Sequence, residues 1–260
     1  MVETSAYWRD LVYLEQVGST NDVAKDLASR GAPAGTVVVT DEQTAGRGRL
    51  DRHWVAPPCS GLLCSILFRP DLRAPQAHRM TMLCSLAAAD AIERLANLPV
   101  ALKWPNDLIV RSRLSAPGRP EWRKLAGLLT ESGLTNAALA FVVVGIGINV
   151  GIPPAQVRDL APNATSILAE TGDRVDRSML LIHLLREVEA RYRRLEHGEG
   201  PHGEWAARLA TLGQRVRVAT SAGPIGGVAE GVTENGALLL RTDDGLVREL
   251  FAGDVTLADP

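Results

Sequence analysis

Hydrophobic and polar positions along the first 200 residues follow two different patterns. Continuous apolar runs predict buried strands at 36–40, 62–68, 100–104, 108–110, 124–130 and 138–144. Apolar residues that recur every three or four positions predict helices over 76–97 and 177–195. A third helix is expected to begin at Ser19, with Asp22 in the capping-box position, and to end at Gly31. The polar segment 111–123 contains two prolines and a glycine, which predict a hairpin loop.

The pattern changes near residue 211. Short apolar runs at 216–218, 227–229, 237–240 and 246–250 are separated by Gly, Asn and Asp residues. This rhythm is typical of a small all-β unit, and we expect a compact barrel. The sequence therefore predicts one large domain over residues 1–210 and a small second domain over residues 211–260.

Composition and charge exclude several classes of protein. The chain has 260 residues, is 46% hydrophobic and carries a formal net charge of −2, so no overall basic field favours nucleic acid. Three cysteines and five histidines show no metal-ligand spacing, so neither a disulfide framework nor a metal site is expected. No signal pattern opens the chain, and no apolar run approaches the roughly 18 residues of a membrane span. We expect a cytoplasmic protein that does not enter a membrane.

A glycine–arginine loop follows the strand at 36–40. Gly46 and Gly48 alternate with Arg47 and Arg49, and Trp54 stands at the end of the loop. Glycine lets the backbone approach a ligand, while guanidinium groups bind phosphate or carboxylate oxygens in pairs of hydrogen bonds. The loop is not a P-loop, because no Gly-Lys-Ser/Thr follows it. It predicts a binding site for a nucleotide-like anion. The simpler alternative is a surface turn with solvated arginines.

Two further segments are candidates for binding. Lys103, one of only three lysines among 28 basic residues, ends a strand before the turn formers Asn106 and Asp107. It predicts a fixed charge for an anion, unless it is a strand-end lysine that reaches solvent. The glycine run 145–151 is not a dinucleotide fingerprint, because Val150 stands where the third glycine belongs and proline-rich sequence, not a helix, follows. We expect close backbone approach to a ligand there, with the Asn149 amide pairing with a base edge.

Taken together, five motifs resemble the bacterial biotin–protein ligase family, the biotin–[acetyl-CoA carboxylase] ligases. The motifs are Gly18 to Asn21, Gln43 to Arg49 with Trp54, Lys103 to Asp107, Lys124 to Glu131, and Gly145 to Val150. The resemblance implies an α+β fold, in which a mixed β-sheet flanked by helices is followed by a small SH3-like β-barrel. It also implies that biotin and Mg-ATP form biotinyl-5′-AMP, from which biotin passes to a lysine of a biotin carboxyl carrier domain.

The same resemblance implies a role for each matching residue. Lys103, Arg47 and Arg49 would supply the catalytic charges. Biotin would be bound by Ser19, Thr20, Asn21, Gln43, Arg47, Gly48, Arg49, Lys103 and Gly127, and the nucleotide by Arg49, Trp54, Lys103, Asn106 and Asn149. The strand from Lys124 to Gly127 would form the floor of the biotin pocket. One departure is Leu50-Asp51-Arg52, where the family often continues Arg-Gly-Arg. The negative charge of Asp51 argues against a phosphate contact by that segment.

Two other functions remain open at this stage. A lipoate or octanoate ligase or transferase has a similar fold and also modifies a carrier lysine. A non-catalytic biotin-binding regulator is a second alternative, which the cationic residues argue against. Only about ten residues precede the matching region, so we expect no helix-turn-helix domain and no DNA binding. The chain is expected to be a monomer or a homodimer.

Overall fold

The computed structural model describes residues 7–8, 10–50, 52–114, 121–135, 138–221 and 223–257. Asp51 and the centre of the loop predicted at 111–123 lie outside these residues. The expectation about Asp51 therefore remains a prediction. The hairpin is confirmed at its base, because Arg111 and Trp122 are antiparallel partners.

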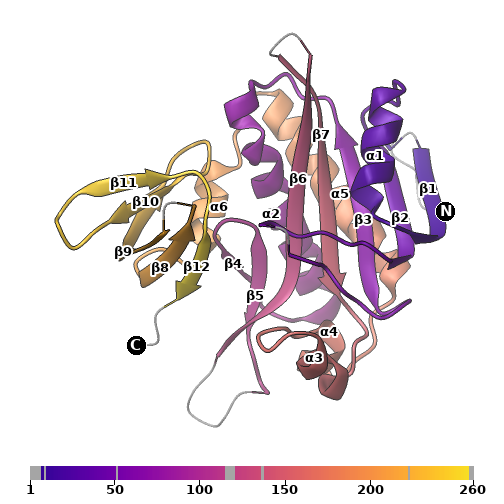
Figure 1. The fold of residues 1–260 in the computed structure, drawn as a ribbon. Coiled ribbons are helices and arrows are strands. Elements are labelled where there is room, and N and C mark those ends of the chain that lie inside the picture. Colours follow the sequence, from indigo (N-terminus) through magenta and orange to yellow (C-terminus); the bar gives the residue numbers. More distant parts are fainter. Residues whose placement is uncertain are drawn as a thin grey trace.

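A seven-stranded sheet forms the centre of the molecule (Figure 1). Its order is β1-β2-β3-β7-β6-β5-β4, in which β1 and β2 run parallel and every other neighbouring pair runs antiparallel. The strands are β1 Asp10–Val17, β2 Thr36–Gln43, β3 Gly61–Phe68, β4 Ala101–Lys103, β5 Asp107–Arg111, β6 Trp122–Thr135 and β7 Ala138–Asn149. The predicted class, a mixed sheet flanked by helices, is confirmed.

Helices cover the two faces of this sheet unequally. Helices α2 (His78–Ala96) and α5 (Arg177–Glu196) pack on one face and share its large core, while α1 (Thr20–Ser29) covers part of the other. Successive strand residues point to opposite faces, so Val37 enters the large core and Val38 packs with α1. The candidate site lies on this second face, beyond α1.

A second, five-stranded antiparallel sheet lies beside the β4 edge (Figure 1). Its order is β11-β10-β9-β8-β12, and its strands are β8 Arg215–Thr220, β9 Gly223–Val232, β10 Leu238–Arg241, β11 Val247–Leu250 and β12 Asp254–Leu257. The fully buried Trp104 joins the two parts, because its indole Nε1 donates to the Gly236 carbonyl at 2.8 Å. The predicted small all-β unit is confirmed, and it shares a core with the large sheet.

Several elements differ from the prediction. Strand β1 and helices α3 (Pro154–Leu160), α4 (Ile167–Thr171) and α6 (His202–Arg208) were not predicted. The expectation that no helix follows the glycine run is wrong, since α3 begins at Pro154, but β7 is antiparallel to both neighbours and so forms no dinucleotide-binding unit. The capping box at Ser19 is also wrong, because Ser19 makes no side-chain cap bond and Asp22 pairs with Arg47. A charge-assisted, bidentate contact is stronger than a neutral cap.

Candidate functional site

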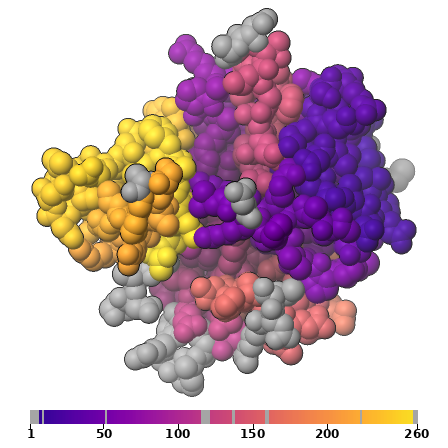
Figure 2. All heavy atoms as spheres, in the orientation of Figure 1, coloured from indigo at the N-terminus to yellow at the C-terminus, as the bar shows by residue number. Residues whose placement is uncertain are grey.

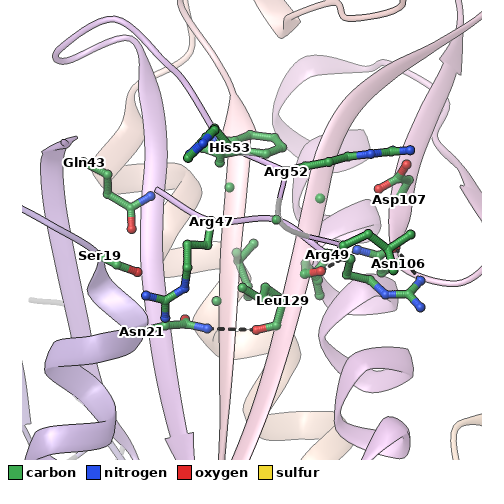
Figure 3. Close-up of a pocket in the computed structure, with 18 of the residues that line it drawn as sticks. Ser19, Asn21, Gln43, Arg47, Arg49, Arg52, His53, Asn106, Asp107 and Leu129 are labelled. Atoms are coloured by element: carbon green, nitrogen blue, oxygen red, sulfur yellow. Dashed lines mark hydrogen bonds between the residues drawn. The ribbon is translucent and has the colours of Figure 1, made fainter. Parts of the chain in front are cut away.

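A pocket opens on the face of the large sheet that carries α1, under the glycine–arginine loop. It is lined by the start of α1, the end of β2, the loop, strands β5, β6 and β7, and the beginning of β12. Figure 3 shows Ser19, Asn21 and Gln43 at one end, with the Arg47 side chain beside them, and Asn106, Asp107, Arg49 and Arg52 at the other. The pocket therefore has two chemically different ends.

The first end is a neutral hydrogen-bonding network. The Gln43 Oε1 atom accepts from the Thr20 backbone N–H at 2.9 Å and from the Thr20 hydroxyl at 3.1 Å. Beneath them, the Ser65 hydroxyl lies 2.7 Å from Thr20 Oγ1 and 2.6 Å from Asn21 Oδ1. Asn21 Nδ2 donates to the Leu129 carbonyl at 3.1 Å and to the carboxylate of Glu131 at 2.8 Å, so one charged group lies behind these uncharged amides and hydroxyls. Because these amides are fixed by the protein, the end is preorganised for a neutral polar group.

Three glycines form the floor of the pocket. A Cβ atom on Gly145 would lie 2.2 Å from Asn21 Oδ1, and one on Gly147 would lie 2.5 Å from the indole of Trp54. A Cβ on Gly127 would lie 3.1 Å from the same indole. These positions need glycine because two side chains, as well as any ligand, lie close against the sheet. The predicted close approach at the glycine run is therefore, in this structure, an approach of protein side chains.

The glycine–arginine loop crosses the pocket and is tied down on both sides. On one side Arg47 makes two hydrogen bonds of 2.6 Å to Asp22 and lies 3.3 Å from Glu131. On the other side Arg52 pairs with Asp254, at the start of β12. Figure 2 shows the front face, where this part of the chain lies between the yellow C-terminal unit and the indigo N-terminal elements. The loop is a strap between the two parts of the molecule.

Neighbouring charges and burial shift pKa values at the strap. The bond to Arg47 lowers the pKa of Asp22 to about 2, with Lys25 contributing. The bond to Asp22 raises the pKa of Arg47, with Glu131 contributing. Burial lowers the pKa of Arg49, whose guanidinium donates to the Gly253 carbonyl at 3.2 Å and lies 3.4 Å from Asn106 Oδ1. Arg47 is thus paired with carboxylates, while the hydrogen bonds of Arg49 described above go to two neutral oxygens.

Lys124 is the ammonium that the structure brings to the second end of the pocket. Its Nζ lies 2.6 Å from Asp107 Oδ1 and 5.6 Å from the centre of the Trp54 ring. A β-bulge places it there: Leu108 is opposite Ala126 and Ile109 is opposite Lys124, so β6 has one extra residue at 125. The extra residue reverses the alternation of side chains and turns Lys124 toward the pocket.

The structure brings most of the predicted site residues together. Ser19, Thr20, Asn21, Gln43, Arg47, Gly48, Arg49, Trp54, Asn106 and Gly127 all line the pocket. Lys103 and Asn149 do not line it. Asn149 is buried, and its Nδ2 donates to the Thr165 carbonyl at 2.9 Å. The roles expected of these two residues at a ligand remain predictions.

Other lining residues had been given no individual role from the sequence. They are Leu50, Arg52, His53, Cys64, Asp107, Lys124, Leu128, Leu129, Gly145, Ile146, Gly147, Gly253 and Asp254. Lys124 and Gly145 to Gly147 nevertheless belong to segments that were expected at the ligand, and lysine scarcity also pointed to Lys124. Nothing in the local sequence of Gly253 and Asp254 indicates that they reach a pocket some 200 positions away.

The arrangement suits a ligand that is neutral at one end and anionic at the other. The first end offers fixed amides and hydroxyls, and the second offers Arg49 and Lys124 beside Asn106. Two anions repel one another, and fixed cations beside them offset that repulsion and so hold them close together. Among the residues that the structure describes, no three His, Cys, Asp or Glu side chains gather as a metal site needs, and no helix is long and apolar enough to cross a membrane.

Known proteins share both parts of this architecture. Residues 13–149 match the Biotin/lipoate A/B protein ligase family, and residues 211–257 match the Biotin protein ligase C terminal domain. The chain is 33% identical over 259 residues to the Bifunctional ligase/repressor BirA of Bacillus subtilis, covering 98% of this chain and 76% of that protein. It is 34% identical over 262 residues to the Biotin--[acetyl-CoA-carboxylase] ligase of Mycobacterium tuberculosis, covering 98% and 91%. The biotin protein ligase from Aquifex aeolicus in complex with biotin and ATP superposes with a TM-score of 0.76 and 28% identity, covering 97% of this chain and all of that one.

Proposed function

Because this chain belongs to the Biotin/lipoate A/B protein ligase family, we propose that it attaches biotin, at the expense of ATP, to a lysine of a biotin carboxyl carrier domain. One observation carries the proposal: a single pocket joins a neutral hydrogen-bonding end to a cationic end. Biotin has the matching shape, with a neutral ureido ring at one end and a carboxylate at the other. Relatives with this fold include a structure in complex with biotin and ATP.

In the first step, a carboxylate oxygen of biotin forms a bond to the α-phosphorus of ATP, and pyrophosphate leaves. Thr20, Asn21 and Gln43 would hold the ureido ring, since their amides and hydroxyls are already oriented by Ser65 and the backbone. Arg49 and Lys124 would offset the repulsion between carboxylate and phosphate and the charge of the transition state.

In the second step, the amine of the carrier lysine attacks the acyl carbon of biotinyl-5′-AMP. An amide forms, AMP leaves with the bonding electrons, and the amine loses a proton. Mg²⁺ enters with ATP as its complex and is held mainly by phosphate oxygens, as this ion prefers. Trp54 and Asn106, which line the pocket, would border the nucleotide, as the resemblance implies. The resemblance implies the same role for Lys103 and Asn149, which do not line the pocket.

The test is to mix the protein with Mg-ATP and either biotin or lipoate, and to measure pyrophosphate and the acyl-adenylate. We expect both products with biotin, followed by biotin transfer to a carrier domain. Products with lipoate alone would favour the lipoate ligase alternative, which the family description also covers. Binding of biotin without products would favour the regulator.

Arg49 separates catalysis from binding in the same assay. Arg49→Ala should reduce adenylate formation far more than it weakens biotin binding measured by calorimetry, because its guanidinium lies at the cationic end. Equal losses in both measurements would show that this charge is misplaced in our scheme.

Three further statements belong to the same proposal. The protein acts in the cytoplasm, where ATP is available, as a monomer or a homodimer that light scattering can distinguish. The division into a ligase domain over 1–210 and a second domain over 211–260 is supported by the match that begins at residue 211. The expected lack of operator binding is tested by a gel-shift assay.

A further inference from the structure

The backbone around Lys124 is supported by a segment outside the central sheet. Strand β7 pairs with β6 only as far as Ala126, which is opposite Ile148. At Lys124 a different segment takes its place: the Lys124 N–H donates to the Asn163 carbonyl at 2.7 Å, and the Thr165 N–H donates to the Lys124 carbonyl at 2.8 Å. Both backbone polar groups of Lys124 are therefore fixed by residues 163–165.

Thr165, the last residue of this segment, is itself held from two sides. It is fully buried, its hydroxyl donates to Glu170 Oε1, and its carbonyl accepts from Asn149 Nδ2 at 2.9 Å. Glu170 lies in α4, which Figure 1 places at the lower end of β5 and β6, and it is 3% exposed. Since Asn149 is the last residue of β7, the segment is hydrogen-bonded both to that strand and to α4.

Glu170 gathers further donors from the end of β5. The Ser112 hydroxyl donates to Glu170 Oε1 at 2.7 Å, and the Arg113 N–H donates to Oε2 at 2.8 Å. A buried carboxylate is costly unless its oxygens are satisfied, and here three donors from two segments converge on it. Such a group fixes the geometry of its surroundings, because moving any one donor leaves a buried charge poorly paired.

We propose that Glu170 is a positioning residue for Lys124, acting through Thr165 and the bulge in β6. The carboxylate fixes residue 165, residues 163–165 fix both backbone groups of Lys124, and the bulge then directs the ammonium into the pocket. This inference rests on the proposed function, since it assigns Lys124 to adenylate formation. Small displacements of a charged group matter there, as about 1 Å of misplacement can cost up to roughly 100-fold in rate.

A pair of substitutions at one position tests the link. Thr165→Val keeps the shape of the side chain but removes the hydroxyl that reaches Glu170, and Thr165→Ser restores a hydroxyl. We expect Thr165→Val to lower kcat for pyrophosphate release roughly tenfold and to leave the KM for biotin within about twofold. Thr165→Ser should recover kcat to within about twofold of the unmodified protein.

The matched control is Thr171→Val in α4, the short helix that contains Glu170. It removes a part-buried hydroxyl that donates to the Ile167 carbonyl at 2.8 Å and accepts from the Asp173 N–H at 3.0 Å, and neither bond leads to Lys124. We expect it to lower the melting temperature without lowering kcat. If it lowers kcat as much as Thr165→Val does, the effect is one of general stability and the positioning role is wrong.

A double-mutant cycle identifies the residue through which the effect passes. In a Lys124→Ala background, Thr165→Val should cause no further loss of kcat, because the group that it positions is gone. A further tenfold loss would overturn the inference, as would unchanged kcat in Thr165→Val alone.

The failure of this inference and the failure of the proposed function can be told apart. If the unmodified protein forms no adenylate with Mg-ATP and biotin, the proposed function is wrong. The geometric claim is then judged from a crystal structure of Thr165→Val or, if that variant does not fold, of Glu170→Gln. A Lys124–Asp107 contact that stays at 2.6 Å with the bulge unchanged would overturn it, and a displaced Lys124 would support it.

Discussion

His78 gives a prediction whose size follows directly from its surroundings. His78 is the first residue of α2, and its ring lies edge-on to Trp205 with 5.6 Å between the ring centres. The ring also lies close to Gly236, on which a Cβ would be 2.1 Å from the imidazole Cδ2. Its Nε2 is buried without a hydrogen-bond partner among the described residues. Burial, with a smaller contribution from Arg49, lowers the pKa of His78 to about 4 from its ordinary 6.5.

The direction in which pH changes the unfolding free energy depends on whether the folded or the unfolded state binds the proton. Between pH 6.5 and about 4 the unfolded chain binds a proton that the folded protein excludes, so stability is fully present above pH 6.5 and is lost as the pH falls toward 4. Each pH unit in this window costs about 1.4 kcal/mol, so the loss between pH 7.5 and pH 5 is about 2 kcal/mol. Thermal or urea unfolding of the unmodified protein should show this loss.

His78→Leu isolates the contribution, because leucine fills the space and does not titrate. The difference in unfolding free energy between the unmodified protein and His78→Leu should change by about 2 kcal/mol from pH 7.5 to pH 5, at fixed ionic strength. His197→Gln removes an exposed imidazole elsewhere and is the control. A change below about 0.5 kcal/mol, within the error of such extrapolations, would refute the reasoning that burial of His78 excludes the proton.

Three other predictions concern the pocket. Lys124→Ala should lower kcat for adenylate formation by about 100- to 1,000-fold, and comparison with Lys103→Ala in the same assay shows which lysine carries the charge. Gly147→Ala should weaken biotin binding by about 1–3 kcal/mol in calorimetry, because its Cβ would lie 2.5 Å from the indole ring, whereas Gly151→Ala meets only one atom at 3.8 Å and should bind normally. Asp22→Asn should cost about 1 kcal/mol of stability at pH 7, after allowance for solvent screening; this contribution is present above pH 3.8 and lost as the pH falls through about 2, so unfolding curves of the two proteins should converge there.

Local patterns predicted the elements whose signals are local. Strand β3 is buried along its whole length and helix α5 carries a helical apolar repeat, so both are confirmed close to their predicted bounds. Strand β1 was missed because it is an exposed edge strand, in which Leu11 and Tyr13 stay largely in solvent. Helices α3, α4 and α6 have seven residues or fewer, too short for a period of 3.6 to be recognised.

The site was predicted as a set of motifs but not in its geometry. The resemblance identified the neutral end, which the structure places around Thr20 and Gln43. It placed the strand from Lys124 to Gly127 at the floor of the pocket but gave the Lys124 side chain no role, because a single extra residue in β6 decides which face that side chain takes and no period in the sequence reveals a bulge. The partners of Arg47 and Arg52 were also unforeseen, since Asp22 and Asp254 reach them only through the tertiary fold.

The strap across the pocket has a consequence for how the protein is made. Arg49 and Gly253, which meet beside the pocket, are separated by 204 positions in the chain. A nascent chain on the ribosome therefore cannot complete the pocket until residue 254 has been added, even if the central sheet has already formed. Contacts of such long sequence separation are slow to form, and a ligand that binds only the completed pocket stabilises both parts of the molecule by mass action. By this reasoning biotin and ATP would stabilise the folded state of a newly made chain as well as serve as its substrates.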